Sequence, residues 1–183
     1  DVFSGTGSLN ITLTAGSDIG NSDQALDVGA GTGQTITASL TAGVTGDSIT
    51  LSSNHAITLT TASADGAITI GADGTVTATN INGGSVDVST QTCDVLLGSV
   101  IANSGAIVID AAGDIDDANT AANTDVDVSA ATSIRLTAGN AIGSTANNSI
   151  DLAANSSVSA SATNGAINLD GRGALTLTAL NTT

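Results

Sequence analysis

Apolar and polar residues alternate in short groups along most of the chain. In each group an apolar residue, a variable residue and a second apolar residue follow one another, as at 49–51, 68–70 and 107–109. Alternation with period two predicts a β-strand, because successive side chains of a strand point to opposite faces. The outer residues of each group are therefore expected in a core. The middle residues, mostly Thr, Asp, Asn and Arg, are expected in water.

These strands are short and closely spaced. Ala-Gly, Asn-Gly, Asp-Gly and Ser-Asn pairs separate them, and such residues suit tight bends. An antiparallel meander would need edge strands protected by Lys or Pro, and the chain contains neither. We therefore predict an all-β fold, a parallel β-helix or β-solenoid, in which the short strands of successive coils stack in register.

One longer sequence pattern occurs twice in the chain. The stretch 11–28 reads ITLTAGSDIGNSDQALDV, and 134–152 reads IRLTAGNAIGSTANNSIDL; a looser copy, DAAGDID, lies at 110–116. We interpret the first triplet as an inward-facing strand, Ala-Gly as a bend, and Ile19 or Ile142 as a core residue on the next side. The polar stretch is then a loop that bulges outward before the second triplet resumes the stack.

The intervals between copies indicate the size of a coil. They predict coils of about 19 to 27 residues, hence about seven to nine coils, with loops absorbing the variation. Residues 1–183 are expected to be a single β-solenoid domain or a segment of a longer shaft. The chain starts in mid-pattern and not with Met, which favours a processed chain or a piece of a longer one.

The doubled pattern resembles a known family. Apolar-x-apolar, Ala-Gly, (Asp/Ala)-Ile-Gly, a polar loop and apolar-Asp-apolar, at 11–28 and 134–152, is similar to the repeats of filamentous-haemagglutinin-like exoproteins of two-partner secretion systems and related bacterial adhesins. The resemblance implies a right-handed parallel β-helix, an extracellular or bacterial cell-surface location, and adhesive or structural work. The family's secretion domain carries an Asn-Pro motif, which has no counterpart in this Pro-free chain. The resemblance therefore implies a shaft.

Charge limits the partners of the chain. The net charge is −15, because all 17 acidic residues are Asp and only two residues are Arg. Nucleic acids and anionic membrane surfaces attract basic proteins, and no run of about 18 apolar residues is present to cross a bilayer. We expect neither nucleic-acid binding nor membrane insertion. The expected partners are copies of the chain itself, end to end or side by side, and cell-surface or matrix glycans.

Catalytic groups do not converge in the sequence. Lyases of acidic sugars need a base and cationic side chains, yet there is no Lys, and Arg135 and Arg172 stand far apart. The single aromatic residue, Phe3, cannot form a stacking platform for sugars. We therefore predict that the chain is not an enzyme and has no obligatory cofactor.

Calcium is the one metal that the residues favour. Asp114, Asp116 and Asp117 form the densest acidic cluster, in the sequence GDIDD. Asp carboxylates and loop carbonyls are calcium ligands. These three residues are therefore candidate calcium ligands, and the simpler interpretation is that they are solvated loop charges.

Threonines suggest an alternative function. Thr-x-Thr groups recur at a constant interval, at Thr12 and Thr14, Thr35 and Thr37, and Thr58 and Thr60. If that interval is the length of one coil there, the groups stack into a flat outward ladder of the kind that ice-binding solenoids use. The alternative is thus a ligand-binding solenoid with ice or carbohydrate as its target. The simpler interpretation is that Thr suits a solvent-facing strand position.

No capping element is recognisable at either end of the sequence. Residues 175–180, LTLTAL, still have the pattern of a strand. Because a solenoid without caps exposes unpaired backbone groups, its coils are expected to continue or to stack on a neighbour. We therefore predict a non-catalytic structural or adhesive β-solenoid that forms a surface fibre or adhesin shaft.

Overall fold

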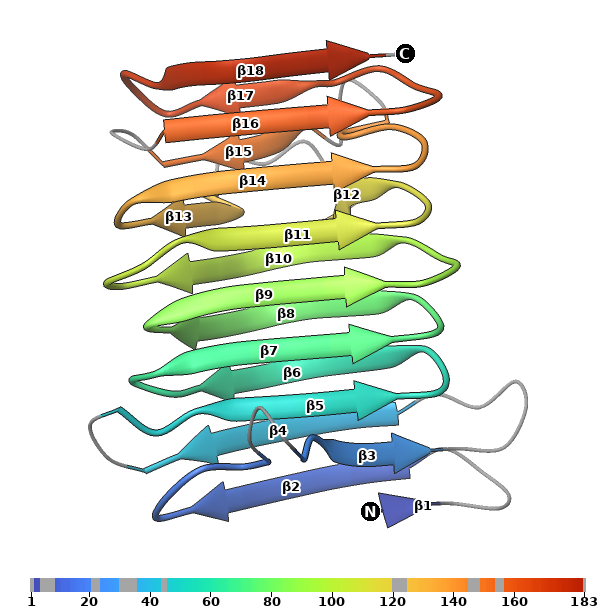
Figure 1. Ribbon diagram of the computed structural model, residues 1–183, viewed down its shortest axis with the longest axis vertical. Helices are drawn as coiled ribbons and strands as arrows, with labels where there is room; N and C mark the ends of the chain where they lie inside the picture. Colours follow the sequence, from blue (N-terminus) through green and yellow to red (C-terminus); the bar gives the residue numbers. More distant parts are fainter. Residues whose placement is uncertain are drawn as a thin grey trace.

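The computed structural model is a stack of short parallel strands arranged in two sheets (Figure 1). Every element in the described part of the chain is a β-strand, and every strand pair is parallel. The structure describes residues 2–3, 9–20, 24–29, 36–43, 46–119, 125–144, 149–153 and 157–182.

The first sheet, sheet A, has nine strands. In spatial order these are β1 (Val2–Phe3), β3 (Leu26–Gly29), β5 (Ile49–Ser53), β7 (Ala67–Ala72), β9 (Ser85–Thr90), β11 (Ile107–Ala111), β14 (Ser133–Ala138), β16 (Ser157–Ala162) and β18 (Thr176–Thr182).

The second sheet, sheet B, also has nine strands. In spatial order from the other end these are β17 (Leu169–Gly171), β15 (Ile150–Leu152), β13 (Val128–Ala130), β10 (Val95–Ala102), β8 (Val76–Gly83), β6 (Ile57–Ser63), β4 (Ile36–Ala42) and β2 (Leu9–Ala15), and β12 (Ile115–Asp117) pairs with β10.

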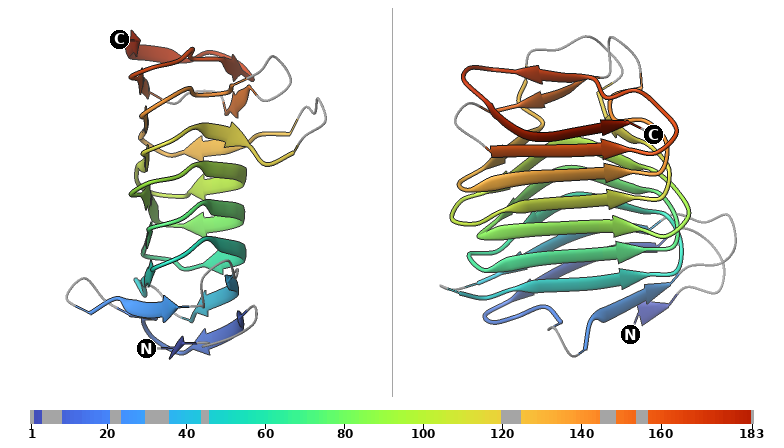
Figure 2. Two further views of the ribbon diagram at one scale, coloured as in Figure 1. Left: turned by 90° about the vertical axis from the view of Figure 1, so that its right-hand side faces the viewer. Right: turned by 45° about the horizontal axis from the view of Figure 1, so that its top comes forward.

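The chain alternates between the two sheets as it climbs. Figure 2 shows the two sheets facing each other, with the N-terminus and the C-terminus at opposite ends of the stack. This alternation confirms the predicted all-β fold of parallel sheets stacked as a β-solenoid. The count of seven to nine coils and the right-handed sense stay predictions.

Inward side chains form continuous apolar columns between the sheets. In sheet A one column contains Ile49, Ile68, Val86, Ile107, Ile134 and Val158, and each of these residues is no more than 2% exposed. Strands of neighbouring coils lie about 4.8 Å apart, so each branched side chain packs directly on the one below it. A core this narrow is filled by Ile, Leu, Val and Ala, which explains how the fold forms without large aromatic residues.

The register gives the length of each coil. Val76 pairs with Val95, which is a short step along the chain, and Ile115 bridges Ile142, which is a long one. Both steps lie within the predicted range of about 19 to 27 residues. The range is too narrow for the whole stack, because the steps from Ile68 to Val86, from Val100 to Val128 and from Ile19 to Ile49 are 18, 28 and 30 residues.

Candidate functional site

The first copy of the doubled pattern contacts sheet A on both sides of its polar stretch. Ile19 bridges Ile49, and Leu26 pairs with Leu51. Gly20 directly after Ile19 has a φ of 67°, which L-residues with a side chain rarely adopt. Ile19 therefore fills the core and the second triplet belongs to the sheet, as the sequence predicted; most of the predicted loop between them lies outside the described residues.

The second copy has the same arrangement, a bridged isoleucine followed by a glycine with positive φ, on the opposite sheet. Ile142 bridges Ile115 in sheet B, Gly143 has a φ of 64°, and the returning triplet places Leu152 beside Val128. The pattern thus occurs on both sides of the solenoid, with its isoleucine bridged to a neighbouring coil each time.

The looser copy at 110–116 produces a third interruption, again in sheet B. The short strand β12 pairs with the first half of β10, and β13 pairs with the second half. The Ala118 N–H still donates to the Leu97 carbonyl at 2.7 Å, and the Asp127 N–H donates to the Asp151 carbonyl at 2.9 Å. Main-chain hydrogen bonds to neighbouring coils are therefore present on both sides of this interruption.

The three candidate calcium ligands do not share a site. Asp114 Oδ1 accepts a 2.7 Å hydrogen bond from the Ala141 N–H, and Asp116 Oδ1 accepts one of 2.7 Å from the Ser144 N–H. Asp117 is only 6% exposed and pairs in register with Leu97, an inward position. Strand alternation separates Asp117 from Asp116, so the cluster in the sequence is not a cluster of ligands in space. No group of three or more metal-binding side chains occurs among the described residues.

Two other aspartates are buried on successive coils of sheet B. Asp127 directly precedes β13 and is 0% exposed, and Asp151 in the middle of β15 is 4% exposed. The Asp127 N–H donates to the Asp151 carbonyl at 2.9 Å, and Asp127 Oδ2 accepts the Asp151 N–H at 2.8 Å. The Asp127 carboxylate thus accepts the hydrogen bond of the Asp151 N–H, which a main-chain carbonyl would accept in a regular parallel pair.

The charges of this pair are only partly compensated. Arg172, just after β17, donates to Asp151 Oδ2 and forms an ion pair with it. The Oδ1 atoms of Asp127 and Asp151 are both buried without a hydrogen-bond partner. Burial raises the pKa of Asp127 to about 7; the Asp151 N–H and Arg172 oppose the rise, and the nearby Asp117 and Asp151 carboxylates add to it.

The sequence did not single out Asp127 or Asp151. Both are middle residues of apolar-Asp-apolar triplets, which were expected to face water, and that expectation is wrong at these two positions. Asp27 has the same place in the first copy and is exposed. The three triplets look alike in sequence. The burial of Asp127 and Asp151, in contrast to Asp27, therefore depends on which coils stack on them.

The threonine groups expected to form an outward ladder are not aligned with one another. Thr12 and Thr14 are exposed in β2, but their register partners in β4 are Ser39 and Thr41. Thr37 lies instead opposite Asn10. The step from one coil to the next is longer here than the interval between the threonine groups, so these groups cannot stack.

A bulge breaks the ladder again one coil later. Thr37 pairs with Thr58, and the register then shifts, so that Thr60 has no partner in β4. Thr35 lies outside the described residues. The predicted ladder of six threonines is therefore wrong, although Thr37, Thr58 and Thr77 do form a shorter column.

An open cleft lies on the outer face of sheet B beside the first of its loops. It has a volume of about 470 Å³ and is lined in part by Thr77, Thr79, Ser99, Asn119 and Asp125. The lining combines hydroxyl, amide and carboxylate groups. Such groups can exchange hydrogen bonds with a polar ligand.

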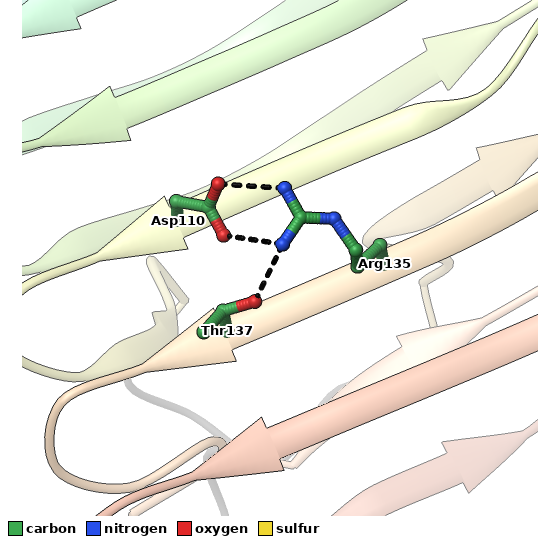
Figure 3. Close-up of polar contacts among 3 residues, drawn as sticks. All are labelled: Asp110, Arg135 and Thr137. Atoms are coloured by element: carbon green, nitrogen blue, oxygen red, sulfur yellow. Dashed lines mark hydrogen bonds and ion pairs between the residues drawn. The ribbon is translucent and has the colours of Figure 1, made fainter. Parts of the chain in front are cut away.

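Arg135 has a structural contact on the outer face of sheet A (Figure 3). Its Nη1 donates to Asp110 Oδ1 at 3.0 Å and its Nη2 to Asp110 Oδ2 at 2.7 Å, and Nη1 also donates to Thr137 Oγ1 at 3.0 Å. The two charged side chains are 49% and 40% exposed. This ion pair links the successive strands β11 and β14 at the solvent-exposed surface of sheet A.

Comparison with known proteins finds no match, whether with a family model, a curated protein or a solved structure. The resemblance to filamentous-haemagglutinin-like repeats therefore stays a prediction. In the described part of the chain, no helix has the length and apolar character needed to span a membrane.

Proposed function

We propose that this chain is a stretch of an extracellular shaft, a non-catalytic structural or adhesive β-solenoid of a bacterial surface fibre or adhesin. A stacked solenoid suits this role because each coil contacts only its neighbours, so the rod can have any length. The acidic surface keeps such rods soluble and apart. The shaft is right-handed and has seven to nine coils within these 183 residues.

The continuous inner columns carry the proposal, because each apolar rung is covered by the coil that stacks on it. Leu177 and Leu180 of β18 stand in register with the buried residues Val158 and Ala160, so they continue the columns of sheet A. Because all pairings are parallel, a second copy in the same orientation extends the sheets and covers both leucines.

Sedimentation and cryo-electron microscopy test this end-to-end contact. Wild-type protein is expected to form concentration-dependent oligomers or thin filaments, and the double variant Leu177→Asp/Leu180→Asp is expected to stay monomeric. Asn181→Asp is the matched control, since Asn181 is an exposed polar residue of the same strand. A wild-type protein that remains monomeric at all concentrations would contradict end-to-end assembly of copies.

The cleft on sheet B favours carbohydrate binding as a second candidate function. Its hydroxyl and carboxylate groups suit the hydroxyl groups of a glycan. A glycan array followed by calorimetry, with Asp125→Asn as the test variant and Asp65→Asn as an exposed control, measures this activity. Ice binding is tested separately by thermal hysteresis, with Thr58→Tyr placed in the short threonine column.

A further inference from the structure

Two buried carboxylate oxygens without partners lie on successive coils. They are Oδ1 of Asp127 and Oδ1 of Asp151, in side chains that are 0% and 4% exposed. The two residues are held side by side by the two hydrogen bonds between Asp127, directly before β13, and Asp151 of β15. A buried acceptor that receives no hydrogen bond lowers the stability of the fold, which makes such a pair unusual in a purely structural position.

The surrounding charge is negative. Asp117, 6% exposed, lies close enough to raise the pKa of Asp127, and Arg172 is the cation that reaches the pair through Asp151. Asp170 pairs in register with Asp151 and also acts on Arg172. When ionised, the four carboxylates exceed the single guanidinium by three negative charges. Buried charge of one sign is unfavourable unless a counter-charge or a proton compensates it.

We propose that Asp127 and Asp151 bind a divalent cation, Ca²⁺, between the coils of β13 and β15. The ion would offset most of the negative excess, and its ligands would be the two free Oδ1 atoms, with water or main-chain oxygens completing the shell. Ca²⁺ accepts such oxygen ligands in variable number and geometry. Zn²⁺ prefers His and Cys, and Mg²⁺ demands a strict octahedron.

This site differs from the acidic cluster that the sequence suggested. The carboxylates of Asp114 and Asp116 are engaged with backbone N–H groups of the next coil, whereas Asp127 and Asp151 keep an oxygen available. Bound Ca²⁺ would link the two coils at the rung where β13 pairs with β15. The inference concerns the isolated chain and does not depend on the proposed shaft function.

Thermal unfolding tests the site, followed by circular dichroism in Ca²⁺ or in EDTA at physiological salt. Millimolar Ca²⁺ is expected to raise the Tm of the wild type by about 5 °C, as expected for a ligand bound only by the folded state. Asp127→Asn should lose most of this shift. Asp27→Asn should keep it, because Asp27 has the same position in an exposed triplet; this control accounts for Ca²⁺ bound loosely by the acidic surface.

The pH dependence of the wild type provides a second test that requires no variant. Protons compete with Ca²⁺ for Asp127, so the Ca²⁺-induced shift should be larger at pH 8 than at pH 6. Calorimetric titration with Ca²⁺ should reveal one site that is tighter than the surface binding. A Tm that does not respond to Ca²⁺ at either pH overturns the proposal, and so does an equal response in Asp127→Asn. An unresponsive Tm would mean that a proton alone compensates the buried negative charge of Asp127 and Asp151.

Discussion

Asp114 Oδ1 accepts a 2.7 Å hydrogen bond from the backbone N–H of Ala141, a residue 27 positions later in the next coil. One coil earlier, Asp94 Oδ1 accepts the Asp114 N–H at 2.8 Å. Aspartates at this turn therefore link three successive coils. Near the N-terminal end of the stack, Asp18 Oδ1 accepts the Ser48 N–H in the same manner, at 2.6 Å. The acidic composition of the chain thus has a part in holding coils together as well as in solubility.

Asp114→Ala should destabilise the fold by about 1–3 kcal/mol, because the partly buried Ala141 N–H loses a charged acceptor. Asp114→Asn keeps an oxygen acceptor and should cost less. Urea titration of both variants measures the free energies of unfolding. Asp65→Ala, at an exposed turn, is the control; if Asp114→Ala is no more destabilising than this control, the inter-coil hydrogen bond has no measurable role.

The two Ala-Gly bends of the doubled pattern should respond differently to the same substitution. A Cβ at Gly139 would lie 2.0 Å from the Ala112 carbonyl oxygen of the coil below, whereas a Cβ at Gly16 would have no atom within 4 Å. Gly139→Ala must displace backbone, so we expect a loss of about 1–3 kcal/mol or more. Gly16→Ala should be neutral within about 0.5 kcal/mol. Equal Tm values of the two variants would contradict the stacking of these coils.

The ion pair between Asp110 and Arg135 should contribute little to stability. Its geometry is bidentate, but nearly half of each side chain is exposed, and water screens such pairs. A double-mutant cycle with Asp110→Ala and Arg135→Ala should give a coupling energy of about 1 kcal/mol or less, decreasing as salt is added. A coupling of several kcal/mol that salt does not affect would show that the pair is shielded from solvent.

The sequence predicted the architecture because local and global preferences agree. Period-two triplets such as 68–70 define strands, and the column of Ile68, Val86 and Ile107 shows that every coil places its triplet over the one below. The core position of Ile19 was also predictable, since an isoleucine after an Ala-Gly bend fits the inner column of the next side.

Register and burial were less predictable. A single extra residue, Thr60, shifts the pairing of β4 and β6, and the sequence contains no signal for such a bulge. Likewise, the triplets that contain Asp27 and Asp127 look alike, but only Asp127 is buried. Burial there depends on which coils stack, and a single sequence does not encode that choice locally.

The pKa of Asp127 leads to a prediction about pH. Burial raises this pKa from 3.8 to about 7 in the folded protein, so between these values the folded state keeps a proton that the unfolded chain has released. Raising the pH through this window therefore favours unfolding, and the contribution of Asp127 to stability falls by at most about 4 kcal/mol before levelling above pH 7.

Asp127→Asn should remove this contribution, because an amide does not titrate. Its oxygen can still accept the Asp151 N–H, and its Nδ2 can donate to the unpartnered Asp151 Oδ1. In EDTA the variant should therefore be more stable than the wild type at pH 8, and the difference should shrink toward pH 4. Chemical denaturation at several pH values measures both curves, with Asp27→Asn as the exposed control. Parallel curves for Asp127→Asn and the wild type would mean that Asp127 is ionised throughout, and that a cation or solvent already compensates its charge.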